Sequence, residues 1–346
     1  MRSYHFIVPP QLLEQRALRG SAEERELALA TLSIDHSIRA GRIQNALLAG
    51  SAQRLQLAVR RGAGRPDRTV FDAKHRLDTH ATSVLRTEEG QPSADAAANQ
   101  AFDGLGATYG FYWDVFRRDS IDNATLPLLG EVHFGERYDN AFWDGQRMMF
   151  GDGDGQLFTG FTKAIDVIGH ELTHGVTEAT LGLRYLGQPG ALNESISDVF
   201  GSMVKQYQLG QTSEQADWLI GAGILGSVMQ GEALRSMKAP GTAYEGDNQP
   251  GSMSGYVSTA SDNGGVHLNS GIPNHAFYLA AVALGGHAWE KAGRIWYEVM
   301  VRRAVGSQAG FVQFAQATTT MAASLFGLGS AEARAVQDAW RETQVL

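Results

Sequence analysis

Apolar residues near the middle of the chain recur at the spacing of a helix. Ile165, Ile168, Leu172 and Val176 are three or four positions apart, and no proline interrupts them. This spacing predicts a helix over residues 161–180 with one apolar face. The pattern continues through the second half of the chain and predicts further helices at 193–208, 273–284, 291–304, 308–326 and 331–341.

The stretch before this central helix has shorter apolar runs, separated by glycine and aspartate. The runs at 70–72 and 129–134 predict strands. The alanine-rich stretch 94–112 predicts a helix with Ser93 as its N-cap. From its residues alone, the aromatic run at 140–143 predicts a hairpin strand with a structural role.

The N-terminal part of the chain differs from the rest. Ser21 and Glu24 fit a capping box that opens a helix. The apolar positions over 27–47 predict a helical hairpin with breaks at Gly20 and Gly41. These residues alone fit either a small accessory helical domain or a propeptide.

The composition is that of an ordinary globular chain. Of the 346 residues, 43% are hydrophobic and 19% are charged, which allows two or three domains with a substantial core. The net charge of −8 and the absence of a basic tract argue against nucleic acid as a partner. The chain has no cysteine, so disulfides, thiolate metal sites and cysteine-protease chemistry are excluded.

The N-terminus lacks the pattern of a signal peptide. The apolar run from Phe6 to Val8 is followed at once by Pro9 and Pro10, and it is too short for a signal-peptide core. No window approaches the length of a membrane span. We therefore expect no conventional secretion signal and leave open whether the protein is secreted by a non-conventional route or stays in the cytoplasm.

The central predicted helix carries the motif H-E-x-x-H. His170 and His174 are one turn apart on the same face, where two neutral imidazoles can share a Zn²⁺ ion. Glu171 is better placed to hold the water on the metal than to bind the metal itself. The alternative is a chance match on an ordinary amphipathic helix, and a third ligand decides between the two.

The third ligand has to come from further along the chain. The continuation H-x-x-G-x-x-H is absent, because Thr177 and Thr180 occupy the Gly and His positions. Glu194 and Asp198 are one turn apart on a predicted apolar helix, where carboxylates are costly to bury without positive partners. We expect Glu194 to bind the zinc and Asp198 to accept the second ring N–H of one of the two histidines. The alternative is a solvent-facing pair of acids.

The sequence H-E-L-T-H, followed by N-E-S-I-S-D at 193–198, resembles the thermolysin family of zinc endopeptidases. Matching stretches occur in the same order from about residue 68 to the C-terminus. The resemblance implies an α+β fold of two lobes with the active-site cleft between them. The implied parts are a β-rich N-terminal lobe, the zinc-binding helix and an α-helical C-terminal lobe, at 69–160, 161–180 and 181–346.

The resemblance also implies roles for residues outside the helix motif. Tyr185 donates to the developing oxyanion, and His267, held by Asp262, stabilises the tetrahedral intermediate. Asn140, Ala141 and Arg235 hold the substrate backbone. The pocket beyond the scissile bond is apolar, which implies cleavage on the amino side of bulky hydrophobic residues; its lining residues are Phe158, Val167 and Leu234. Taken alone, the histidine would be an ordinary loop residue and the arginine a surface residue.

The N-terminal sequence I-V-P-P-Q-L-L resembles the short propeptides of the protealysin-like subgroup of this family. The resemblance implies that residues 1 to about 50 form an inhibitory prosegment and that protein or peptide substrates compete with it. A Pro-Pro segment is rigid and loses little entropy when it docks in a cleft that binds extended peptides. The basic, glycine-rich stretch up to residue 68 predicts an exposed linker that is open to cleavage.

One departure from the family concerns calcium. The family's double calcium site would include acids at positions held here by Asp166, Asp217 and Lys205. Because Lys205 replaces a carboxylate, we expect its ammonium to pair with Asp166, with or without Asp217, and no calcium to bind there.

Two other functions fit part of the pattern. A zinc aminopeptidase would use the same helix motif but would need acidic residues for the substrate amine, and no G-x-M-E-N stretch precedes His170. A catalytically silent zinc-binding protein would not need the complete set of ligands and catalytic residues found here. We therefore expect a zinc endopeptidase in precursor form.

Overall fold

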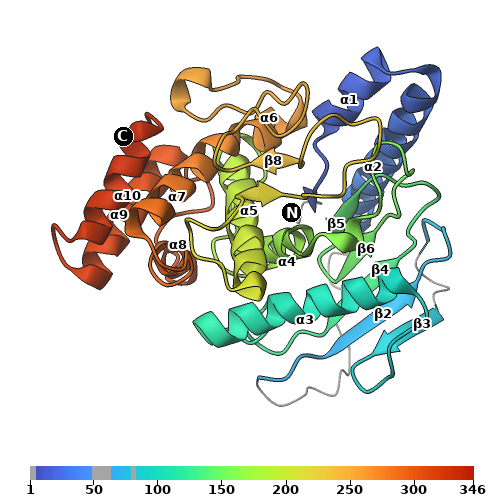
Figure 1. Ribbon diagram of the computed structural model, residues 1–346, viewed down its shortest axis with the longest axis horizontal. Helices are drawn as coiled ribbons and strands as arrows, with labels where there is room; N and C mark the ends of the chain where they lie inside the picture. Colours follow the sequence, from blue (N-terminus) through green and yellow to red (C-terminus); the bar gives the residue numbers. More distant parts are fainter. Residues whose placement is uncertain (1–4, 49–63, 79–82) are drawn as a thin grey trace.

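The computed structural model describes residues 5–48, 64–78 and 83–346, so most of the expected linker lies outside the described residues. The chain forms two lobes and an N-terminal helical hairpin (Figure 1). The N-terminal lobe contains a six-stranded sheet with the order β1-β5-β6-β4-β2-β3. In that order, the strands span His5–Phe6, Ala141–Trp143, Arg147–Phe150, Leu128–Val132, Arg68–Asp72 and Ser83–Thr87.

Helix α3 (Ala96–Phe116) packs against β2 and β4. Strand β4 runs parallel to both β2 and β6, and the other pairs in the sheet are antiparallel. The central helix α4 (Ile165–Ala179) follows a short 3-10 turn at Phe161–Lys163. The C-terminal lobe is helical; its helices α5 to α10 span Gly187–Leu209, Asp262–Asn269, Gly271–Leu284, Ala292–Val301, Phe311–Phe326 and Ala331–Glu342.

The expected α+β fold with a β-rich and a helical lobe is confirmed, but several local expectations are wrong. Helix α2 (Ala22–Leu48) continues through Gly41, so the only break is at Gly20 and Ser21, which separate it from α1 (Pro10–Arg19). The N-cap of α3 is Asp95, whose side chain accepts from Ala98 N at 3.1 Å, and not Ser93.

The expected strand 129–134 ends early and the second lobe is less helical than expected. Strand β4 ends at Val132 because His133 takes a left-handed conformation, with φ of 56°. Between α5 and α6 the chain is largely irregular and contains the two-stranded pair β7 (Leu219–Ile220) and β8 (Arg235–Ser236). These strands are two residues long, too short to leave an alternating pattern in the sequence.

Two glycines allow the helices that carry the motifs to approach each other closely. A Cβ on Gly201 of α5 would lie 2.4 Å from the carbonyl oxygen of Asp166, and one on Gly169 of α4 would lie 3.0 Å from Cα of Gly201. The two backbones therefore touch where they cross. This contact places α5 beside the histidines of α4.

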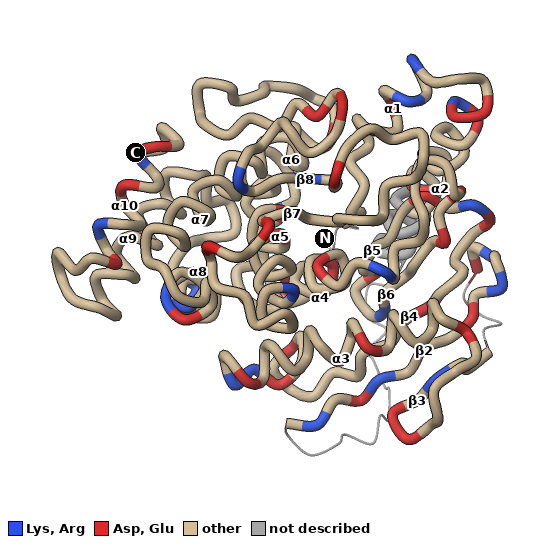
Figure 2. The backbone as a smooth tube through the Cα atoms, in the orientation of Figure 1, with Lys and Arg blue, Asp and Glu red and all other residues tan. Residues whose placement is uncertain are grey.

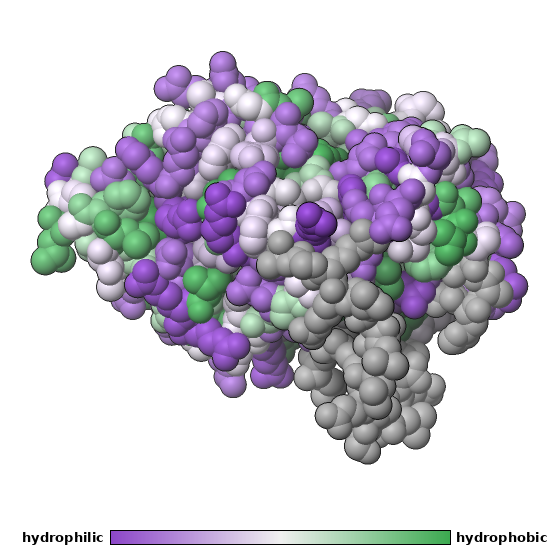
Figure 3. Space-filling model, turned by 90° about the horizontal axis from the view of Figure 1, so that it is seen from below, coloured by the Kyte–Doolittle hydropathy of each residue, from purple (hydrophilic) through white to green (hydrophobic). Residues whose placement is uncertain are grey.

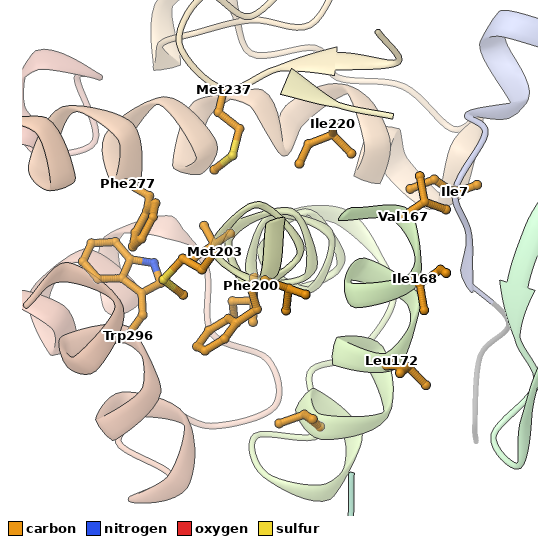
Figure 4. Close-up of a cluster of buried hydrophobic side chains, with 14 of the residues drawn as sticks. Ile7, Val167, Ile168, Leu172, Phe200, Met203, Ile220, Met237, Phe277 and Trp296 are labelled. Carbon is orange, nitrogen blue, oxygen red and sulfur yellow. The ribbon is translucent and has the colours of Figure 1, made fainter. Parts of the chain in front are cut away.

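Apolar side chains on both sides hold this crossing in place. Ile168 and Leu172 on α4 are buried on one side, and Phe200 and Met203 on α5 face Phe277 and Trp296 of the C-terminal lobe (Figure 4). Fully burying such side chains contributes about 1.5–3 kcal/mol each.

The surface is polar and carries charges of both signs. Lysine and arginine alternate with aspartate and glutamate over both lobes (Figure 2). The face seen from below is mostly hydrophilic, with apolar side chains gathered at the end where the C-terminal helices lie (Figure 3). Among the described residues, no helix has the length and apolarity needed to cross a membrane.

Candidate active site

The two histidines of α4 and one glutamate of α5 converge in the interior between the lobes. His170 Nε2 and His174 Nε2 are 3.0 Å apart. Glu194 brings Oε2 to 3.4 Å from His170 Nε2 and Oε1 to 3.5 Å from His174 Nε2. All three side chains are buried. The spacing of four along α4 and the close crossing with α5 bring these atoms together.

The other ring nitrogen of each histidine has its own partner. His170 Nδ1 lies 2.8 Å from Asp198 Oδ1, and His174 Nδ1 lies 2.9 Å from Asn193 Oδ1. If each Nδ1 donates to its oxygen acceptor, both Nε2 lone pairs point into the same space. Asp198 itself is held by Arg235 Nε at 2.8 Å and by Asn274 Nδ2 at 2.8 Å.

These residues fit a zinc ion. Ligands at 2.0–2.1 Å in a tetrahedral site are about 3.3 Å from one another, which is close to the spacings of 3.0, 3.4 and 3.5 Å. Burial lowers the pKa of His174 to about 3, which favours the neutral ring that a ligand needs. Against burial, the carboxylates of Asp198 and Glu194 raise the pKa of His170 to about 9, so a metal that binds there would displace a proton. Among the described residues, the buried atoms Glu194 Oε2 and Glu171 Oε1 have no hydrogen-bond partner, as expected where an ion and a water belong.

Glu171 also lies close to the two histidines: one of its carboxylate oxygens and one ring nitrogen from each of His170 and His174 lie within 4.8 Å of one another. Its Oε2 accepts from the backbone N of Trp143 at 3.0 Å, and its side chain is fully buried. Burial raises the pKa of Glu171 well above its usual value, which increases its affinity for a proton. A carboxylate tuned in this way can act as a general base and then as an acid.

Three further residues lie on the side of His170, His174 and Glu194 that is away from Glu171: Tyr185, His267 and Asp262. The Tyr185 hydroxyl donates to Glu194 Oε1 and lies 3.4 Å from His267 Nε2. Asp262 Oδ1 is 2.6 Å from His267 Nδ1, and its Oδ2 accepts from the backbone N of His267 at 2.8 Å. Four successive residues with positive φ (262–265) bend the start of α6 beside this contact.

The N-terminal segment occupies the space next to these residues as an extended peptide. Strand β1 pairs antiparallel with β5, and Ile7 N donates to Ala141 O at 3.2 Å. Val8 N donates to Asn140 Oδ1 at 3.0 Å, and Arg235 Nη1 donates to Ile7 O at 2.9 Å. All three residues expected to hold a substrate backbone therefore hold the backbone of the chain's own N-terminus.

Phe158, Val167 and Leu234 are buried in one apolar cluster that also includes Ile7. The Ile7 side chain lies beside Val167 of α4 (Figure 4). A small pocket behind the segment is lined by Pro9, Leu234, Arg235 and His267, among others. A larger surface hollow between α8 and α9 has no histidine or carboxylate in its lining and offers no comparable chemistry.

Lys205 is placed where a cation would lie between two acids. Its Nζ is 3.0 Å from Asp166 Oδ2 and 2.9 Å from Asp217 Oδ1, and it donates to Leu219 O at 2.7 Å. Burial opposes the charge on Lys205, but the nearby Asp166 and Asp217 raise its pKa above the usual value. The ammonium is therefore a fixed positive charge at this position.

Several residues of the site were not singled out from the sequence. Asn193 and Ser197 contact His174, and Asn274 donates to Asp198, but isolated polar residues on apolar helices carry no distinctive signal. His5 stacks on His174 with ring centroids 3.9 Å apart, although nothing local in the sequence marks it. Asp35 of α2 accepts from Asn140 Nδ2 at 3.0 Å, which requires the fold to bring the two together.

An arrangement with metal donors on one side and an extended peptide backbone held on the other is that of a metallopeptidase. Residues 53–178 match the family described as thermolysin metallopeptidase, catalytic domain, and residues 181–345 match its alpha-helical domain. The chain belongs to the thermolysin family of metallopeptidases, whose members depend on zinc, and it is a metalloendopeptidase.

Similar proteins cover nearly the whole chain. An extracellular metalloprotease of Pectobacterium carotovorum subsp. carotovorum is 49% identical over 345 residues, 98% of this chain and 96% of that protein. Protease PrtS of Photorhabdus sp. (strain Az29) is 40% identical over 99% of this chain and 92% of its own length. The solved precursor of protealysin, a metalloproteinase from Serratia proteamaculans, superimposes with a TM-score of 0.88 and 46% identity, covering 99% of this chain and 100% of that one.

These relatives correct the expectation about the compartment. The sequence left two locations open, secretion by a non-conventional route and the cytoplasm. Relatives from Pectobacterium and Serratia marcescens, however, are named extracellular metalloproteases. Leaving the cytoplasm open was wrong, because the lack of a recognisable signal core says little about where a protease of this family acts.

Proposed function

We propose that this chain is the precursor of a neutral zinc endopeptidase in which His170, His174 and Glu194 hold the metal and Glu171 is the general base. One observation carries the proposal: the two imidazole Nε2 atoms lie 3.0 Å apart, and the two oxygens of one buried carboxylate lie 3.4 Å from His170 and 3.5 Å from His174. A zinc ion held there supplies Lewis acidity, which lowers the pKa of water and polarises a carbonyl group.

Each of the surrounding residues has a defined task. Glu171 takes a proton from the attacking water and delivers it to the leaving amine. The hydroxyl of Tyr185 and Nε2 of His267 donate to the oxyanion, and Asp262 holds the His267 ring. Asp198 holds the ring of His170 so that its Nε2 stays directed at the metal.

Substrates bind as an added strand on β5. Asn140 Oδ1, Ala141 O and the Arg235 guanidinium are the groups that bind the peptide backbone, by the mode that they show with residues 7 and 8. The side chain that comes after the cleaved bond enters the apolar pocket of Phe158, Val167 and Leu234. Cleavage on the amino side of Leu, Ile or Phe is expected from this lining.

Residues 1 to about 50 inhibit the enzyme by occupying this strand position. Ile7 and Val8 use the backbone contacts that a substrate needs, and Asp35 of α2 accepts from the Asn140 amide and from the Tyr138 hydroxyl, at 3.0 and 2.5 Å. The hairpin is therefore fastened to the catalytic lobe next to the strand with which the segment pairs. Because these contacts are intramolecular, the effective concentration of the inhibitor is high.

An endopeptidase is favoured over an aminopeptidase because the bound backbone does not end at the metal site. His5 and Phe6 continue on the far side of the position that Ile7 occupies. An aminopeptidase would close this side with acids for the substrate amine. We also propose that Lys205 takes the place of calcium between Asp166 and Asp217.

Metal content and casein hydrolysis of the purified chain, beside Glu171→Ala, test the function. The expected result is one zinc per chain in both proteins, casein digestion by the wild type alone after loss of about fifty N-terminal residues, and cleavage before Leu, Ile or Phe in a peptide library. A wild-type chain that binds no zinc contradicts the proposal. Hydrolysis of aminoacyl anilides without casein digestion would favour the aminopeptidase.

A further inference from the structure

The N-terminal segment lies across the catalytic residues in the direction and register of a substrate. Ile7 contributes its N–H to Ala141 O and its carbonyl to Arg235, and Phe6 O lies 3.0 Å from His267 Nε2. His267 is the residue assigned to the oxyanion. The peptide bond between Phe6 and Ile7 therefore occupies the position of the bond to be cut.

A bound segment in this register would be hydrolysed if a water could reach the Phe6 carbonyl carbon. The water oxygen would bond to that carbon, the bond to Ile7 N would break, and Glu171 would pass a proton to the new amine. An inhibitor held in this way persists only if something prevents that attack. The residue that precedes Phe6 is placed to do so.

His5 lies against the metal ligands. Its ring stacks on His174 with centroids 3.9 Å apart and meets Tyr185 edge-on at 4.2 Å. One ring nitrogen of His5, one of His174 and one carboxylate oxygen of Glu194 lie within 4.8 Å of one another. His5 is buried, with 6% of its surface exposed, so the site excludes solvent on this side.

We infer that His5 is a fourth ligand of the zinc in the precursor and takes the position that the attacking water needs. The inference rests on the proposed function, because it requires zinc at His170, His174 and Glu194. A site with four protein ligands is closed, whereas a catalytic site has three and one open position. The same N-terminal segment thus presents a cleavable bond and removes the water that would cleave it.

A metal-centred readout tests this without relying on activity. The full chain with Glu171→Gln is loaded with Co²⁺, whose visible absorption reports the number and type of ligands. His5→Phe keeps an aromatic ring against His174 and Tyr185 but has no nitrogen, and His36→Phe, at an exposed position on α2, is the matched control. We expect the spectrum to change in His5→Phe alone and the metal to pass to a chelator on the order of tenfold faster.

The second measurement uses the zinc-loaded chain with Glu171 intact. Mass spectrometry should show His5→Phe cut between Phe6 and Ile7, with the wild type and His36→Phe intact at that bond over the same time. A spectrum and a chelation rate that are unchanged in His5→Phe overturn the inference. If none of the variants binds metal, the proposed function fails instead, so the two failures are distinguishable.

Discussion

Replacing Lys205 by methionine tests whether its ammonium substitutes for a cation. Methionine keeps most of the side-chain volume and removes the charge. Asp166, whose side chain is 2% exposed, then keeps its charge without the partner 3.0 Å away, and Leu219 O loses its donor. Breaking a buried pair costs about 3–5 kcal/mol. The low end applies because Asp217, the second acid, is 46% exposed.

A cost of about 3 kcal/mol lowers the melting temperature by about 6 °C, at roughly 2 °C per kcal/mol for a chain of this size. The assay is calorimetry or circular dichroism on the Glu171→Gln background, where self-digestion does not distort the transition. Lys291→Met is the matched control: this lysine is 42% exposed and pairs with Glu332 at 3.1 Å. Its loss should cost less than about 1 kcal/mol.

Two results would refute the reasoning. One is a Lys205→Met protein with the same melting temperature as Lys291→Met, which would mean that the Lys205–Asp166 pair contributes nothing to stability. The other is a wild-type chain that gains stability in millimolar calcium, with the gain abolished by Asp166→Asn. A ligand that binds only the folded state raises the stability of that state. Such a gain would therefore mean that calcium binds at the position between Asp166 and Asp217 that Lys205 occupies.

The geometry supports three further predictions. Glu171→Gln should retain one zinc per chain by metal analysis and lose about 10²–10⁴-fold in casein hydrolysis, since only proton transfer is removed; retained activity would assign the base elsewhere. Gly201→Ala should destabilise the fold and weaken zinc binding, because its Cβ meets Asp166 O at 2.4 Å, whereas Gly110→Ala, with open space around it, should be neutral or stabilising in the same melts. His133 has its pKa raised to about 9 by hydrogen bonds to Asp152 and Asp95, against burial. The stability that the folded state gains from the charged His133 ring is therefore complete below about pH 6.5 and is lost as pH rises through 9. Denaturant melts over this pH range should show a loss of stability of about 1 kcal/mol, after discounting the exposure of both acids. His133→Asn tolerates the left-handed backbone and should abolish this dependence of stability on pH.

The parts of the site that lie within one helix could be predicted from the sequence. His170, Glu171 and His174 were predicted from a spacing of four on an apolar helix, because an α-helix turns about once in that distance. Glu194 and Asp198 were predicted from the same spacing and from the cost of burying unpaired carboxylates. Asn140, Arg235, Tyr185 and His267 came only from the resemblance to a family, since their local sequences carry no chemical signal of their own.

Tertiary structure decided what lies far apart in the chain. Arg235 and Ile7 are 228 positions apart and His267 and Phe6 are 261 apart, and no local periodicity encodes such contacts. Two further contacts depend on how the hairpin packs on the catalytic lobes: that of Asp35 with Asn140 and that of His5 with His174. Helix α2 runs through Gly41, because a single glycine in a long helix costs only about 1 kcal/mol.

The sequence by itself therefore determined the helices, the order of the lobes and the metal-binding motif, because helical periodicity and burial of charge are read from neighbouring residues. Only the tertiary structure decided that the N-terminal segment pairs with β5 between Arg235 and Ala141, with His5 stacked on His174. The close crossing of α4 and α5 at Gly169 and Gly201, which brings His170, His174 and Glu194 together, likewise depends on two surfaces meeting rather than on either pattern alone.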